Sequence, residues 1–153
     1  MAARQTWALD ILAAEDTPSD IDLLQLALKR CGDVRSLEIV RDGLELINYL
    51  QGKPPFNQPD RQVPNIILMD LKMPRLDGFE VLKWLRANPE CSVIPVIVMS
   101  GSGLDQDVLQ AYRLGANAYF EKPGSFEQLE EILRSILLFW SSAKRPPITR
   151  FPC

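Results

Sequence analysis

Polar side chains with compatible chemistry follow four of the apolar runs in this sequence. Glu15 and Asp16 follow the first run, and Asp70 follows the third. Ser100 follows the next run, and Lys122 follows the last. Carboxylates that lie close together raise one another's pKa unless a cation lies among them. Because the available ligands are oxygens, that cation should be a hard one, and Mg²⁺ is the natural choice.

This set of side chains indicates chemistry on a phosphoryl group. A carboxylate beside a metal ion can attack phosphorus and form an aspartyl phosphate. Catalysis of such a transfer consists mostly of positioning and of neutralising charge on the phosphoryl oxygens. Asp70 is the candidate nucleophile, Lys122 the candidate ammonium group, and Ser100 a hydroxyl able to donate to a phosphoryl oxygen.

The elements that must hold these residues alternate between short apolar runs and helical patterns. The predicted strands are 7–14, 36–40, 65–69, 94–99 and 117–120. After each of them, apolar residues recur at the three- and four-residue spacing of a helix face. Repeated strand-helix units predict an α/β fold, with a parallel sheet covered by helices on both faces. Ligands of such sheets bind beyond the carboxyl ends of the strands, where these polar residues lie.

Residues that favour helix ends mark some of the boundaries. Thr17 is a predicted N-cap, because Pro18 takes the first helical position and Asp20 lies three residues after the cap. Gly32 lies where a helix end favours a left-handed residue. The stretch 51–64 contains four prolines and is predicted to be a loop.

Composition excludes several classes of function. The chain has 153 residues, enough for one domain that folds without a disulfide or a structural metal. It contains no histidine, which removes Ser-His-Asp triads, histidine metal sites and a histidine phosphocarrier. A net charge of -3 gives no electrostatic reason to expect a nucleic acid or an anionic membrane as partner. No apolar run approaches the ~20 residues of a membrane span.

Four sequence blocks resemble the signatures of one protein family. They are ILAAEDTPSD, IILMDLKMPRLDG, VIVMSGSG and AYFEKP, in the family's order and at suitable spacing. Over about residues 7–140, the chain is similar to response-regulator receiver domains, the phosphoacceptor modules of two-component signalling. The resemblance implies a flavodoxin-like (βα)5 fold, doubly wound, with strand order 2-1-3-4-5. Residues 1–140 would form the receiver domain and 141–153 a C-terminal extension, with no separate output domain.

The resemblance also implies the ligands of the metal. Asp16 matches a direct metal ligand, and Glu15 matches an acid that acts through water. Asp70 matches the phosphoacceptor, and the backbone carbonyl of Lys72 matches a further protein ligand. The implied Mg²⁺ site therefore consists of these residues.

Other matching positions belong to the residues that change conformation on phosphorylation in the family, called the switch. Ser100 matches the switch hydroxyl, Tyr119 the switch aromatic residue, and Lys122 the lysine that precedes a proline. Lys72 stands where many members have asparagine, and Ser102 occupies a second variable position beside the site. Both variable positions tune the lifetime of the phosphoryl group in the family, so the resemblance leaves that lifetime open.

The implied function is that of a single-domain response regulator. It would accept a phosphoryl group on Asp70 from a histidine kinase, catalyse only its own phosphoryl transfer and slow autodephosphorylation, and signal through protein contacts. The EDTPSD opening, the 51–64 loop and the LLFW ending most resemble regulators that partner phytochrome-type histidine kinases. Three scattered cysteines and a start that lacks a signal-peptide core predict a reduced, cytoplasmic protein.

Each site residue also has a purely structural interpretation. Glu15 and Asp16 could cap the first helix, where acids suit the positive end of the helix dipole. Asp70 could be an ordinary turn residue, and Ser100 could belong to a strand-to-helix turn. Lys122 could be a solvated charge, and Tyr119 could belong to the core. Their joint occurrence favours the functional interpretation.

Two other functions remain open for this architecture. One is a scaffold that keeps the fold without being phosphorylated. The other is a flavodoxin-like electron carrier, although the acidic EDTPSD loop would repel a flavin phosphate in the absence of a cation. The sequence contains neither a complete dinucleotide fingerprint nor a Walker A motif.

The last predicted helix suggests self-association. One broad face holds the apolar residues expected to pack on the sheet, namely Phe126, Leu129, Leu133, Ile136, Leu137 and Trp140. Ile132 and Phe139 fall beside that face and form a second apolar strip, unless they only widen the core contact. Exposed apolar strips mark interfaces, and receivers in the family commonly dimerise through the fourth helix, fifth strand and fifth helix. We therefore expect a homodimer through the last helix and the fifth strand.

Overall fold

The computed structural model describes residues 8–147 as strands and helices in strict alternation. The strands are β1 (Leu9–Ala14), β2 (Val34–Val40), β3 (Ile66–Met69), β4 (Val96–Ser100) and β5 (Ala118–Glu121). The helices are α1 (Pro18–Cys31), α2 (Gly43–Gln51), α3 (Gly78–Ala87), α4 (Asp105–Arg113) and α5 (Phe126–Ser142).

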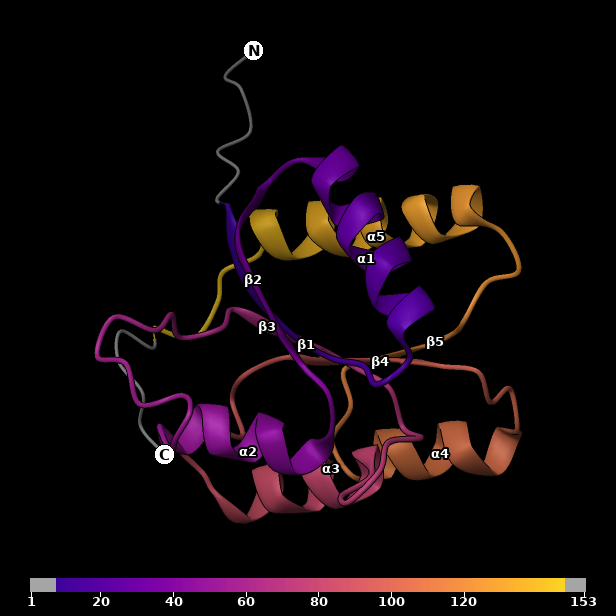
Figure 1. Cartoon of the computed structure of the whole chain (residues 1–153). Helices are drawn as coiled ribbons and strands as arrows, with labels where there is room; N and C mark the ends of the chain where they lie inside the picture. The colour runs from indigo at the N-terminus through magenta and orange to yellow at the C-terminus, as the bar shows by residue number, and fades with distance from the viewer. Residues whose placement is uncertain (1–7, 148–153) are drawn as a thin grey trace.

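All neighbouring strands are parallel, and the sheet has the order β2-β1-β3-β4-β5. Helices α1 and α5 cover one face of the sheet, and α2, α3 and α4 cover the other (Figure 1). The predicted flavodoxin-like, doubly wound α/β fold with order 2-1-3-4-5 is therefore confirmed. The chain switches direction across the sheet between β1 and β3, so a crevice forms where the carboxyl ends of these two strands part.

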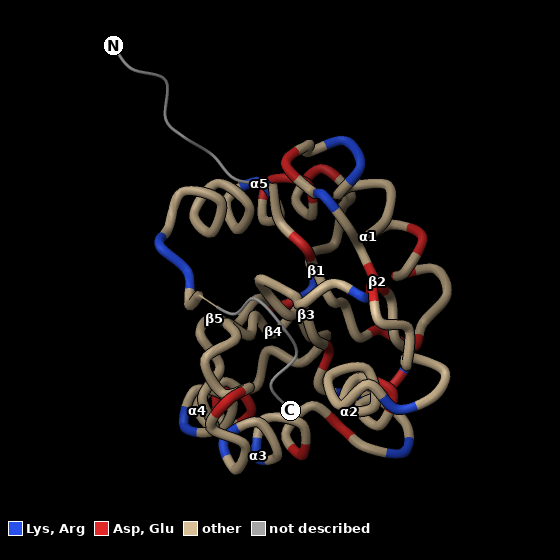
Figure 2. The backbone as a smooth tube through the Cα atoms, turned by 90° about the vertical axis from the view of Figure 1, so that its left-hand side faces the viewer, with Lys and Arg blue, Asp and Glu red and all other residues tan. Residues whose placement is uncertain are grey.

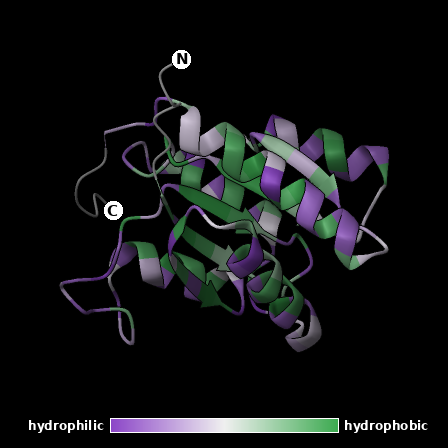
Figure 3. Ribbon diagram, turned by 90° about the horizontal axis from the view of Figure 1, so that it is seen from above, coloured by the Kyte–Doolittle hydropathy of each residue, from purple (hydrophilic) through white to green (hydrophobic). Residues whose placement is uncertain are grey.

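The sheet separates two apolar cores, because successive strand residues point to opposite faces. Ile66 and Leu68 pack with α1 and α5, whereas Ile67 and Met69 pack with the helices on the other face. Because helices cover both faces of the sheet, every side chain of β3 is buried, and the strand sequence is an unbroken apolar run. Figure 3 shows hydrophobic central strands between helices of mixed hydropathy, and in Figure 2 the charged residues lie mostly on helices and loops.

The sequence correctly predicts where α1 starts. The hydrogen bonds at this start differ from the predicted ones. Thr17 is the N-cap residue and Pro18 begins the helix, yet the Thr17 side chain makes no cap hydrogen bond with any described residue. Glu15 Oε1 instead accepts hydrogen bonds from the N–H groups of Asp16 and Thr17, at 3.1 and 3.2 Å. At the other end of α1, Gly32 adopts the expected positive φ of 71°. Glu15 thus fixes the turn that leads into α1 without bonding to an N–H of the helix itself.

Side-chain caps on three other helices were not predicted, and one of them is Ser125, which caps α5. Asp42 Oδ1 accepts from the N–H of Glu45 at 2.8 Å and begins α2. Asp77 and Glu80 form a reciprocal capping box at the start of α3. Such caps typically contribute about 1 kcal/mol each. The box on α3 matters for the site because the loop between β3 and α3, residues 70–77, begins with Asp70.

Three other sequence expectations can be compared with the structure. Residues 52–64, which lie wholly within the described part of the chain, form neither helix nor strand, so the predicted loop over 51–64 is confirmed except for Gln51, the last residue of α2. No helix within residues 8–147 is long and apolar enough to cross a membrane. Cys31 is a free thiol, but Cys91 is disulfide-bonded, so the expectation of fully reduced cysteines is wrong for Cys91. Cys153 lies outside the described residues.

Gly78 permits α3 to begin against the end of β3. Its N–H donates to the carbonyl of Leu71 at 2.9 Å. A Cβ at this position would lie 2.7 Å from the carbonyl oxygen of Asp70 and 2.8 Å from Cα of Leu71. Both are backbone atoms, so relief would require the strand end or the helix to move.

We expect Gly78→Ala to lower the free energy of unfolding by about 1–3 kcal/mol, the usual cost of overpacking. Urea-induced unfolding would measure this loss. Gly124→Ala is a matched control, because its added Cβ would have no described atom within 4 Å. Equal stability of the two variants would contradict the role given to Gly78.

Candidate functional site

The predicted acidic residues meet where β1 and β3 end. Carboxylate oxygens of Glu15, Asp16 and Asp70 lie within 4.8 Å of one another. Glu15 and Asp70 are buried, and Asp16 is half-buried. The parallel sheet therefore brings together acids that are far apart in the sequence, as expected from the strand-end rule.

Lys122 enters this cluster from the turn that follows β5. Its Nζ lies 2.8 Å from a carboxylate oxygen of each of three acids, Glu15, Asp20 and Asp70. An ammonium group has three N–H donors, so each donor has its own carboxylate. The backbone N–H of Lys122 also donates to the carbonyl of Ser100 at 2.7 Å. The turn that carries the lysine is thus fastened to the end of β4.

Burial and ion pairing act in opposite directions on these charges. Burial raises the pKa of Glu15 above its ordinary value, although hydrogen bonds from Lys122 and from the Thr17 backbone lower it. Burial by itself would lower the pKa of Lys122, but hydrogen bonds to the three carboxylates outweigh that effect and raise it. Lys122 is therefore charged at neutral pH.

Asp20 is a member of the site that sequence reasoning missed. Its distance from Thr17 predicted only a role at the start of α1. In the structure its carboxylate pairs with Lys122, and its side chain is 37% exposed. The sequence did place Asp20 in the first turn of a helix that begins directly after a strand end. This position does not predict in which direction the side chain points.

The backbone after β3 surrounds the Asp70 carboxylate. The N–H of Lys72 donates to Asp70 Oδ1 at 3.2 Å, so the backbone of Lys72 lies beside the acid cluster. The Lys72 side chain is exposed. Any contribution of this residue to a metal site would therefore come from its main chain, as the resemblance implies.

The two predicted switch residues both bond to Ser102, in the loop after β4. Ser100 is fully buried, and its Oγ accepts a hydrogen bond from the N–H of Ser102 at 3.3 Å. The Tyr119 hydroxyl donates to the carbonyl of Ser102 at 2.7 Å. The loop also contacts α4, because Ser102 Oγ donates to Asp107 Oδ2 at 2.5 Å. The N–H of Tyr119 donates to the Tyr112 hydroxyl at 3.2 Å, which connects β5 to the same helix.

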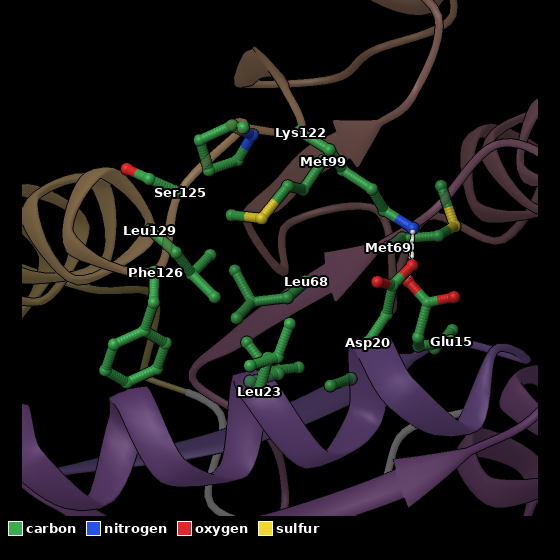
Figure 4. A pocket seen from close by; sticks show the side chains of 15 residues that line it. Glu15, Asp20, Leu23, Leu68, Met69, Met99, Lys122, Ser125, Phe126 and Leu129 are labelled. Atoms are coloured by element: carbon green, nitrogen blue, oxygen red, sulfur yellow. Dashed lines mark hydrogen bonds and ion pairs between the residues drawn. The ribbon is translucent and has the colours of Figure 1, made fainter.

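An apolar cavity of about 160 Å³ opens beside Lys122, between α1 and the turn that leads into α5. Leu23, Met99 and Phe126 contribute to its apolar wall, and the paired Asp20 and Lys122 form part of its polar end (Figure 4). The acidic site therefore has one apolar flank.

A doubly wound parallel sheet with an acidic cluster and a lysine at its carboxyl edge defines a class of protein. The chain belongs to the response regulator receiver domain family, which its residues 11–134 match. It is a receiver domain homologous to single-domain response regulators of two-component systems.

The relatives include proteins of closely similar length. Response regulator Rcp1 of Synechocystis sp. is 37% identical over 130 residues, which cover 85% of this chain and 87% of Rcp1. The crystal structure of the phosphorylated cyanobacterial phytochrome response regulator RcpA has a TM-score of 0.82 at 35% identity, covering 90% of this chain and 98% of RcpA. The Mn²⁺-bound form of Rcp1 has a TM-score of 0.80 at 34% identity, covering 90% and 99% of the two chains.

Removal of Lys122 tests the electrostatic description of the site. We expect Lys122→Met to lower the free energy of unfolding at pH 7 by about 1–3 kcal/mol, because Glu15 and Asp70 would be buried without their cation. The deficit should shrink as the pH falls, since the already raised pKa of Glu15 would rise further and protonation would remove the repulsion. Urea unfolding at several pH values in the presence of a chelator would measure both effects.

Lys83→Met provides the control for this experiment, because Lys83 is exposed on α3. It should leave the free energy of unfolding nearly unchanged at every pH. A loss in Lys122→Met that matches the control, or that grows toward acidic pH, would contradict the description.

Proposed function

We propose that this chain is a single-domain response regulator that accepts a phosphoryl group on Asp70 from a histidine kinase. The position of Asp70 is the observation that carries the proposal. Its Oδ2 lies 2.8 Å from Lys122 Nζ, and its carboxylate belongs to the buried acid cluster. Because Asp70 directly follows a strand packed on both faces, its backbone is held in one orientation for attack.

The transfer follows from these positions. An oxygen of the Asp70 carboxylate forms a bond to phosphorus while the bond from phosphorus to the donor's imidazole nitrogen breaks. The electrons of the broken bond stay on that nitrogen, and the product is an aspartyl phosphate. Lys122 faces the charge on the phosphoryl oxygens, and Ser100 supplies a hydroxyl that can donate to one of them. Water later cleaves the acyl phosphate, so catalysis is limited to this transfer and slow autodephosphorylation.

The acid cluster fits a divalent cation, which we propose to be Mg²⁺. Glu15, Asp16 and Asp70 offer carboxylate oxygens within 4.8 Å of one another, and oxygen donors suit a hard ion. The main-chain carbonyl of Lys72 is the further proposed ligand, supported by the Lys72 N–H bond to Asp70. The similarity to Mn²⁺-bound Rcp1 also supports a divalent ion. When bound, the ion would add positive charge beside the phosphoryl oxygens.

Ser100 and Tyr119 are the proposed switch. A Ser100 hydroxyl that turns toward a phosphoryl oxygen must change its hydrogen bond with Ser102. The carbonyl of Ser102 holds the Tyr119 hydroxyl, so the change reaches β5. The Tyr119 ring is half-buried and already bonded to this loop, so its expected inward movement starts from an existing contact. A local change in charge would thereby alter a surface on α4 and β5.

The proposed partners are proteins. A phytochrome-type histidine kinase is favoured because RcpA is a phytochrome response regulator and this chain is 35% identical to it. The downstream partner is proposed to be a protein, with no direct binding to nucleic acid or membrane. The proposal also includes a cytoplasmic location, a receiver domain over 1–140 and an extension over 141–153 without an output domain of its own.

A homodimer through α5 and β5 completes the proposal. The side chains of Leu138 and Phe139 are 54% and 62% exposed on α5. Ile132 is instead partly buried and packs against the core, so the apolar strip differs from the one expected. Strand β5 is an edge of the described sheet, which leaves room for a two-fold contact beside it.

Asp70→Asn should abolish phosphorylation, because the nucleophilic oxygen is replaced by an amide. Wild-type protein treated with acetyl phosphate and Mg²⁺ should give a slower band on a phosphate-affinity gel, and the variant should not. Asp60→Asn, an exposed change in the 51–64 loop, should behave like the wild type. Wild-type rates in Asp70→Asn would refute the assignment, and a wild type that is never modified would favour the scaffold interpretation.

Phe139→Glu should convert the dimer to a monomer, because a charge would be buried in the contact. Sedimentation with and without a phosphate analogue would measure assembly, with tighter association expected in the phosphorylated state. Val93→Glu changes another exposed apolar residue, on the turn before β4, and should still dimerise. A monomeric wild type in both states, or a Phe139→Glu variant that dimerises equally well, would count against this contact.

A further inference from the structure

The lysine of the site is fully occupied before any phosphoryl group arrives. Lys122 Nζ lies 2.8 Å from Glu15 Oε2, Asp20 Oδ2 and Asp70 Oδ2. Since an ammonium group has three N–H donors, contact with an oxygen of the incoming phosphoryl group, while Asp70 is still ionised, requires that one of these carboxylates be released. Which acid is released depends on how well each of them is solvated without the lysine.

The three acids differ sharply in their access to water. The Glu15 and Asp70 side chains are 8% and 7% exposed, whereas that of Asp20 is 37% exposed. A buried carboxylate that loses its cation is left poorly solvated, but a partly exposed one is hydrated instead. Asp20 is therefore the partner that Lys122 can give up at the lowest cost in free energy.

We propose that Asp20 is a positioning residue that holds Lys122 in the unphosphorylated protein and releases it as a phosphoryl group approaches Asp70. The inference rests on the proposed function. Figure 4 shows the Asp20 and Glu15 carboxylates beside the Lys122 amine, with Asp20 projecting from α1. Asp20 competes with the incoming phosphoryl oxygens for one ammonium hydrogen, and this competition restrains phosphorylation.

The release also has a structural consequence. Asp20 belongs to the first turn of α1, and Lys122 belongs to the turn before α5, so their ion pair joins the two at the mouth of the apolar cavity. Farther along α1, Arg30 Nε lies 2.9 Å from Glu130 Oε1 of α5. This second ion pair does not involve the lysine. Release of Lys122 by Asp20 would therefore free the first turn of α1 while the two helices stay packed.

The test compares rate constants of phosphorylation by acetyl phosphate and of dephosphorylation. Asp20→Asn removes the charge and nearly preserves the shape, and Asp20→Glu restores the charge. Asp22→Asn makes the same change in net charge on the same helix, and Asp22 is exposed and is not among the described partners of Lys122. We expect phosphorylation about two- to fivefold faster in Asp20→Asn, the size of a partly exposed ion pair. Dephosphorylation should change less, and Asp20→Glu and Asp22→Asn should resemble the wild type.

The sign of the effect separates positioning from structural support. If Asp20 only stabilised the fold, its loss would misplace Lys122 and slow phosphorylation. Slower or unchanged phosphorylation in Asp20→Asn, or equal acceleration in Asp22→Asn, overturns the inference. Thermal unfolding checks that the variants fold, and Asp20→Ser replaces Asp20→Asn if that variant does not. A wild type that takes up no phosphoryl group overturns the proposed function as well. If the wild type is phosphorylated and the Asp20 variants are phosphorylated at the same rate, only this inference is overturned.

Discussion

Negative charge gathers where β1 and β3 end, and the Lys122 ammonium lies at the centre of it. Glu15 and Asp70 are both buried and would repel each other strongly without this cation. The surrounding structure is arranged to place the ammonium there. The backbone of Lys122 is bonded to Ser100 at the end of β4, and its Nζ reaches α1 through Asp20. One charged group therefore connects β1, β3, β5 and the first turn of α1.

Another buried acid, Asp10, lies at the opposite end of β1 and has a structural role. Asp10 Oδ1 accepts hydrogen bonds from Arg35 Nε at 3.0 Å and from Ser36 Oγ at 2.6 Å, both on β2. Burial raises the pKa of Asp10, but these hydrogen bonds outweigh burial and lower it. Its partners come from the neighbouring strand and fasten the sheet. The acids at the carboxyl end instead share one cation, an arrangement that leaves them able to bind a metal or to react.

Most of the fold was predictable because the strands are apolar on both faces. β3 and β4 read as short unbroken apolar runs, and a parallel sheet covered on both sides buries such runs completely. The helix caps were harder to predict. Asp42 and Asp77 lie in stretches where aspartate is equally common in turns, so their capping roles depend on backbone geometry. The disulfide at Cys91 likewise had no signal in cysteine spacing.

Sequence alone determined which acids, lysine and hydroxyl would lie at one edge of the sheet, because the carboxyl ends of parallel strands share that edge. Tertiary structure alone decided which of them touch and which side chains remain exposed. Asp20 joined the site because α1 leaves β1 at an angle that points its first turn toward Lys122. Ile132 and Phe139 looked equivalent on a helical projection, yet Ile132 packs into the core and Phe139 stays exposed. A helical period gives the angle between side chains, but only the packing of the helix on its sheet sets which angle faces inward.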